Sequence, residues 1–128
     1  MLKILLLISG GALGTLFRYA VTGMTHRFYE TNFPLGTLIV NISGSFFIGF
    51  IWSFWEQSNL HTNVRTFVFI GVLGGYTTFS SFAIETLNLF RDGEIKSALI
   101  NIAANNFLGL IFVFVGFILA KWIINLLK

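Results

Sequence analysis

The stretch "GGYTTFSSFAIET", residues 74–86, places paired glycines, several hydroxyl side chains, two phenylalanines and a glutamate inside an otherwise hydrophobic segment. Phe79 and Phe82 are three residues apart and Glu85 follows at the same interval, so these side chains share one face of a helix. The edge of a phenylalanine ring carries positive potential and can contact an anion. Ordinary core packing gives the same spacing, and the neighbouring hydroxyl groups, Ser81 among them, make an anion path an equal alternative.

A second polar track lies in "PLGTLIVNISGSFFIG", where Thr37, Asn41, Ser45 and Gly49 recur every four residues and therefore follow one side of a helix. Asn41 is its strongest candidate, because an amide supplies two N–H donors that can replace water around an anion. A single buried asparagine usually contributes only about 1 kcal/mol to contact between helices. The aligned track favours a pore wall or a polar dimer interface.

The remaining intramembrane polar candidates are Arg18, Asn101, Asn105 and Asn106. A polar group at membrane depth is costly unless it is paired, so each is a functional candidate. The guanidinium of Arg18 can extend to the membrane interface, pair within a dimer, or contact a transported anion. Asn105 and Asn106 are neighbours and point in different directions, and the residues that follow them are aliphatic or aromatic.

The overall composition indicates which elements must position these residues. The chain is 55% hydrophobic and 10% charged, against about 25% charged for soluble proteins, and its mean hydropathy is +0.84. A membrane-spanning helix needs about 20 apolar residues. Stretches of this kind cover about residues 4–23, 35–55, 66–90 and 97–124. The connections are short, so we expect an all-α membrane protein with one domain over residues 1–128.

The third of these stretches has the features of a broken helix. Gly71, Gly74 and Gly75 lack side chains, and the threonines and serines that follow can bond nearby backbone groups in competition with the helix. Backbone groups freed by a break are tolerated in lipid only where protein or a water-filled cavity satisfies them. Channels and transporters place ion sites at such breaks.

The positive charges give little preference for one orientation in the membrane. Four spans place Lys3, Arg65, Lys121 and Lys128 on one side and Arg27, Arg91 and Lys96 on the other. Orientation follows the Lys and Arg count of short loops, so this balance predicts insertion both ways and an antiparallel, dual-topology homodimer. The alternative is a fixed orientation set by a single basic residue.

Other function classes find no support in the residues. The N-terminal "MLKILLLISGGALG" has the parts of a signal peptide, but hydrophobic residues continue past it, so we expect a first span. Cysteine is absent, which excludes disulfides and thiolate metal sites. A net charge of +3 without a basic face gives no reason to expect nucleic-acid binding. No nucleophile and base pair, metal cluster or phosphate loop indicates an enzyme.

Three segments together, "GGALGTLFRY", "PLGTLIVNISGSFFIG" and "GVLGGYTTFSSFAIE", resemble the Fluc fluoride channels, also called CrcB proteins, in the order of that family. The resemblance implies passive fluoride export through two pores of an antiparallel homodimer, with a structural sodium ion at its centre. It also implies a multi-pass protein of the bacterial cytoplasmic membrane that confers fluoride resistance.

The resemblance assigns roles residue by residue. Phe79 and Phe82 are similar to the pore-lining phenylalanines, Asn41 to the pore asparagine and Thr37 to a pore-entry hydroxyl, while Arg18 and Glu85 resemble vestibule residues. Gly74 and Thr77 resemble the residues whose carbonyl groups hold the sodium ion. In the fourth span, Asn105 or Asn106 stands where some members carry a ladder of hydroxyl residues. That departure leaves open a heterodimer with a sister subunit.

Two rival functions are weighed against the channel. A small proton-coupled drug exporter also has four spans and dual topology, but it needs a carboxylate deep in its first span, and this first span has none. Glu85 is the only carboxylate inside an expected span and lies toward its end. The second rival is a subunit that assembles without transport, in which the polar residues only hold helices together.

Overall fold

The computed structural model describes residues 1–29, 31–57 and 61–127. Within them, four helical stretches are long and apolar enough to cross a membrane, as the sequence predicted. Three are continuous: α1 (Leu2–Phe28), α2 (Leu35–Gln57) and α6 (Ile95–Leu126). The third span consists of consecutive segments: α3 (Thr62–Arg65), the π-helical η1 (Thr66–Leu73), α4 (Gly74–Tyr76) and α5 (Phe79–Arg91). The spans extend past the ends expected from hydropathy, except that α2 begins at Leu35 as expected.

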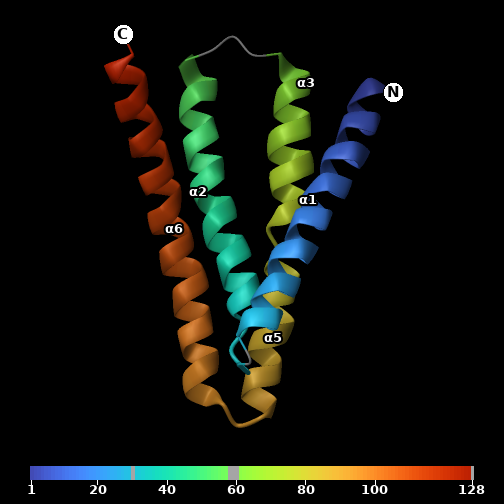
Figure 1. Ribbon diagram of the computed structural model, residues 1–128, viewed down its shortest axis with the longest axis vertical. Helices are drawn as coiled ribbons and strands as arrows, with labels where there is room; N and C mark the ends of the chain where they lie inside the picture. Colours follow the sequence, from blue (N-terminus) through green and yellow to red (C-terminus); the bar gives the residue numbers. More distant parts are fainter. Residues whose placement is uncertain (30, 58–60, 128) are drawn as a thin grey trace.

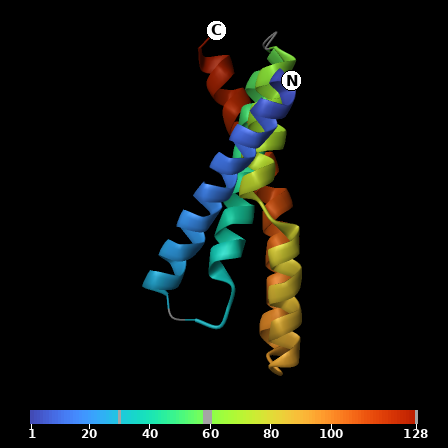
Figure 2. The same cartoon turned by 90° about the vertical axis from the view of Figure 1, so that its right-hand side faces the viewer.

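The spans run up and down in the order of the chain. Figure 1 shows one end of the molecule with the N-terminus, the end of α2, the start of α3 and the end of α6. The other end holds the connections from α1 to α2 and from α5 to α6. In the half that follows the break, α5 runs beside α6, and α1 and α2 lie on the other side (Figure 2). The break therefore lies where the two pairs of helices meet.

Glycines allow α1 to approach the third span closely. A Cβ on Gly10 would lie 2.7 Å from the carbonyl oxygen of Phe67, and one on Gly14 would collide with the backbone around Tyr76. On the facing side, a Cβ on Gly75 would lie 2.7 Å from the carbonyl oxygen of Gly11. Small residues four apart let membrane helices pack backbone to backbone. These pairs serve packing within one chain.

A second close contact joins α2 to α6. A Cβ on Gly49 would collide with the carbonyl group of Val113, and one on Gly116 would collide with that of Phe46. Gly49 is the last member of the polar track on α2, so the track ends in a helix contact rather than in a polar wall. The earlier members of the track, Thr37, Asn41 and Ser45, remain available for the site.

The third span is broken, but the glycines do not break it. Gly74 is helical, with φ −66° and ψ −35°, and Gly71 and Gly75 also lie within helical segments. The extended residues are Thr77 (φ −75°, ψ 155°) and Thr78 (φ −150°, ψ 120°). The part of our prediction that attributed the break to the glycines was therefore wrong. Gly71 and Gly75 lie where α1 packs, whereas a Cβ on Gly74 would meet only the Phe69 carbonyl oxygen at 3.7 Å. The Thr78 side chain and Asn41 of α2 supply the partners that the backbone at the break needs.

Candidate functional site

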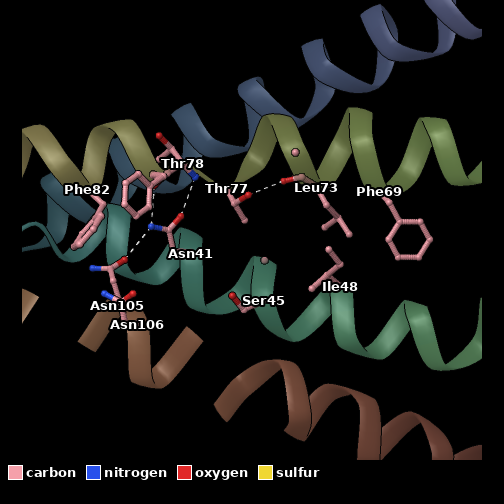
Figure 3. A pocket seen from close by; sticks show the side chains of 13 residues that line it. Asn41, Ser45, Ile48, Phe69, Leu73, Thr77, Thr78, Phe82, Asn105 and Asn106 are labelled. Atoms are coloured by element: carbon pink, nitrogen blue, oxygen red, sulfur yellow. Dashed lines mark hydrogen bonds between the residues drawn. The ribbon is translucent and has the colours of Figure 1, made fainter. Parts of the chain in front are cut away.

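A cavity of about 330 Å³ lies beside the break, between α2, the third span and α6. Its wall consists of Asn41, Gly44, Ser45, Ile48, Phe69, Leu73, Gly74, Thr77, Thr78, Phe79, Phe82, Asn105 and Asn106 (Figure 3). Of the predicted site residues, it brings together Asn41, Gly74, Thr77, Phe79, Phe82, Asn105 and Asn106. None of these lining residues carries a charged side chain.

Asn41 holds the break in place. Its Oδ1 accepts a hydrogen bond of 2.9 Å from the Thr78 N–H, and its Nδ2 donates to the Thr78 carbonyl oxygen at 3.0 Å. The second N–H of the same amide donates to Oδ1 of Asn105 at 2.9 Å (Figure 3). The Asn41 amide thus satisfies backbone groups that the extended conformation has removed from the helix. Direct donation from Asn41 to an anion requires one of these bonds to open.

Thr78 begins α5 with its side chain. The hydroxyl accepts a hydrogen bond of 3.1 Å from the Ser81 N–H and donates to the Ser81 hydroxyl at 3.1 Å. This is the N-cap arrangement, which satisfies a free N–H of the first helical turn. The N-terminus of a helix is also its positive end and favours anions. Ser81, predicted to line the pore, lies in this first turn outside the wall of the cavity.

The two phenylalanine rings meet edge to face at the start of α5. Their centroids are 5.2 Å apart and the ring planes are inclined by 61°. Phe82 is only 7% exposed, whereas Phe79 is 76% exposed. The chain therefore encloses one of the two predicted pore rings and presents the other to its surroundings.

Thr37 and Glu85 lie together in a second cavity of about 230 Å³ near the α1 to α2 and α5 to α6 connections. The Thr37 hydroxyl donates to Oε1 of Glu85 at 2.7 Å. The other carboxylate oxygen, Oε2, is buried without a hydrogen-bond partner among the described residues. Thr37 precedes Asn41 by one helical turn, so the polar track on α2 runs from this cavity to the one beside the break.

Arg18, a predicted vestibule residue, lies at the break. Its Nη1 atom is 3.4 Å from the carbonyl oxygen of Thr77, to which it donates. The Thr78 N–H points to Asn41, so it is not bonded to its helical acceptor, the carbonyl of Gly74. Two carbonyl groups predicted as sodium ligands thus lie where the helix no longer uses them. Carbonyl oxygens are ligands that hard cations accept.

In the fourth span, Asn105 and Asn106 differ in direction. Asn105 is half-buried and reaches Asn41, whereas Asn106 is exposed and donates to the Ile102 carbonyl of its own helix at 2.7 Å. Asn105 is therefore the residue that faces the break. The sequence spacing placed Asn101 one turn away, but Asn101 was not included among the predicted site residues.

The fold and the cavity define a multi-pass helical membrane protein with a broken span beside an uncharged cavity whose wall includes amide and hydroxyl groups. The profile of the family described as "CrcB-like protein, Camphor Resistance (CrcB)" matches residues 5–117. A Parabacteroides distasonis protein named "Fluoride-specific ion channel FluC" is 52% identical over 128 residues, 100% of both chains. Proteins of the same name are 44% identical in Dehalococcoides mccartyi, over 89% of this chain and 88% of the relative, and 43% identical in Campylobacter fetus, over 88% of each.

The chain therefore belongs to the CrcB-like family. The membership confirms the resemblance that the three sequence segments indicated, and it sets aside the drug exporter.

Proposed function

We propose that this chain forms a passive, fluoride-selective channel that lets fluoride leave the bacterial cytoplasm and so confers resistance to it. The chain matches relatives named as fluoride-specific ion channels along its full length. The observation that carries the proposal is the uncharged cavity where the third span breaks, whose wall combines amides and hydroxyl groups with phenylalanine rings. The family is one of ion channels, and the chain is not an enzyme.

Selectivity follows from the donors that the break provides. Fluoride is small and strongly hydrated, so a pore must replace its water with hydrogen-bond donors and positive ring edges while staying too narrow for larger halides. A buried lysine or arginine in the wall would hold the anion too strongly for it to leave. Hydroxyl groups, the edges of Phe79 and Phe82, and the N-terminus of α5 attract an anion without a fixed charge.

We place this function in an antiparallel homodimer with two pores. The nearly even Lys and Arg count on the two sides supports dual topology. The exposed ring of Phe79 supports a pore wall that a second chain completes. A further cavity of about 350 Å³ with an almost entirely apolar wall, which includes Phe17, Phe47 and Tyr76, offers a surface for such a partner. A sister subunit in place of a second copy is the alternative.

A structural sodium ion fits the break, where we assign the carbonyl groups of Gly74 and Thr77 as its ligands. Both lie at the end of the helical part of the span, and the first has lost its helical donor. A bound sodium ion would supply fixed positive charge and join the two chains. The Arg18 guanidinium donates to the Thr77 carbonyl, so it competes with the cation for that oxygen.

The proposed function is tested by ion efflux from liposomes that contain the purified protein. We expect fluoride to leave and chloride to stay, because the cavity presents weak donors and no fixed charge to the ion. Equal loss of both halides would contradict the selectivity. No loss of fluoride from liposomes that contain a correctly assembled protein would favour the assembly subunit without transport.

A further inference from the structure

Four side chains form a continuous series of hydrogen bonds between the break and α5, and we name this series the amide relay: Asn41, Asn105, Asn101 and Thr86. Asn41 donates to Oδ1 of Asn105 at 2.9 Å, Asn105 donates to Oδ1 of Asn101 at 2.9 Å, and Asn101 donates to the Thr86 hydroxyl at 2.9 Å. The Thr86 hydroxyl then donates to the Phe82 carbonyl at 2.7 Å. The relay connects α2, α6 and α5.

Both ends of the relay specify the same direction of donation. At one end, the N–H and the carbonyl of Thr78 require the Asn41 amide to present its oxygen to the first and its nitrogen to the second. At the other end, the Phe82 carbonyl only accepts, so the Thr86 hydroxyl donates to it and accepts from Asn101. The orientation of each amide between them is thereby fixed.

Asn101 and Thr86, the half of the relay farther from Asn41, are buried outside the two cavities described above. Asn101 is 0% exposed and Thr86 is 7% exposed. Neither residue lines the cavity beside the break or the cavity at Thr37 and Glu85. A buried polar group without a partner costs about 1–3 kcal/mol. Any role in ion passage must therefore act through the residues that these two side chains orient.

We propose that Asn101, held by the Thr86 hydroxyl, is a positioning residue for the anion path: it keeps the oxygen of Asn105 toward Asn41 and so keeps Asn41 on the backbone of Thr78. This inference rests on the proposed channel function. It assigns a task to two residues that do not contact the ion. Conduction then depends on a hydroxyl group one turn beyond Phe82, outside the wall of the cavity.

The physical step is the reversal of one amide. The Asn105 nitrogen donates both to the Asn101 side chain and, at 3.1 Å, to the Asn101 backbone carbonyl, so loss of the side-chain acceptor removes one of its two partners and weakens the hold on the amide. In the reversed orientation the Asn105 NH2 group faces the NH2 group of Asn41, and two donors without an acceptor between them repel. Asn41 turns away from Thr78, and the break loses the bonds that define its shape.

Thr86→Val is the main test, because it removes the hydroxyl and keeps the β-branched shape. Thr86→Ser is the matched control that keeps the hydroxyl. Asn101→Leu is a second variant that removes the amide and leaves no unpaired polar group of its own. Each is purified as the assembled protein with 15N-labelled asparagine, placed in liposomes for fluoride efflux, and examined by NMR for the side-chain amide signals of Asn41.

We expect Thr86→Val and Asn101→Leu to slow fluoride efflux by about tenfold or more, and Thr86→Ser to stay within about twofold of the unmodified rate, since one unpaired buried donor costs enough for that change. We also expect the Asn41 amide signals to shift in the first two variants only. Asn41 is hydrogen-bonded to Thr78 and Asn105 and to neither substituted residue, so a merely structural loss at α5 and α6 would leave its signals unchanged.

The proposal would be overturned if Thr86→Val or Asn101→Leu left both the Asn41 signals and the efflux rate unchanged. It would also be overturned if Thr86→Ser shifted the Asn41 signals and slowed efflux. If Thr86→Val does not assemble, Asn101→Leu decides by the same two measurements. If the unmodified protein itself passes no fluoride, the proposed function fails, and the NMR signals still decide whether the amide relay orients Asn41.

Discussion

At the scale of single residues, Asn41 uses its whole amide within the protein. It bonds both backbone groups of Thr78 and also Asn105. The sequence singled out this residue but suggested a different task, direct donation to an anion. Periodicity shows which side of a helix a residue occupies, and it does not show whether another residue has already taken its donors. The role that the structure adds for Asn41 is to hold the backbone of the break in place.

Replacement of Asn41 tests this task. We expect Asn41→Leu to lower the melting temperature of the purified protein and to slow fluoride efflux at least about tenfold, because each unpaired buried backbone group of Thr78 costs about 1–3 kcal/mol. Thr78 is only 7% exposed, so water does not replace the lost partner. Asn63→Leu, the same change in α3, serves as the control. A melting temperature equal to that of the control would contradict the structural task.

At the scale of elements, the four spans follow directly from runs of apolar residues, and the break follows from a local excess of hydroxyl groups. The glycines were assigned to the wrong effect, since the same absence of a side chain serves both a break and a close helix contact. The choice between Asn105 and Asn106 needed the rotation of α6 about its axis, which no pattern within α6 defines. The pairing of Asn101 with Thr86 depends on the register between α5 and α6, which are joined through Gly93 at φ 77°.

Alanine at two glycines of α1 distinguishes packing from helix propensity. Gly14→Ala is expected to lower the melting temperature, because the added methyl group collides with the backbone of the third span. Gly23→Ala has nothing within 4 Å of the added methyl group and is expected to keep or raise it, by at most about 1 kcal/mol of helix propensity. Equal effects in thermal unfolding of the two purified variants would show that the α1 contact does not limit stability.

At the scale of the whole molecule, a single chain leaves parts of its proposed path incomplete. The ring of Phe79 is exposed, and the Gly74 carbonyl lacks its helical donor because the Thr78 N–H bonds Asn41. In the proposed antiparallel pair, the second chain brings its own Phe79 ring and its own carbonyl groups close to those of the first chain. The cation would then be bound by carbonyl groups from both chains. Composition and loop charge could suggest such an assembly, and only contacts between chains define it.

Removal of sodium tests the assembly proposal. We expect replacement of sodium by N-methylglucamine to lower the melting temperature of the purified protein, since a ligand at 100 times its dissociation constant stabilises by about 2.7 kcal/mol. Potassium in place of sodium controls for ionic strength and is expected to protect less. An identical melting temperature in all three salts would contradict a structural sodium site.

The bond between Asn41 and Thr78 also sets an order for biogenesis. Synthesis proceeds from the N-terminus, so α1 and α2 are complete before the extended threonines leave the ribosome. The polar backbone of the break therefore finds its partner already made, and Asn105 joins only when the last helix arrives. A nascent chain that stops after α5 already contains the residue that protects the break from lipid, and the C-terminal helix completes the wall rather than rescuing the third span.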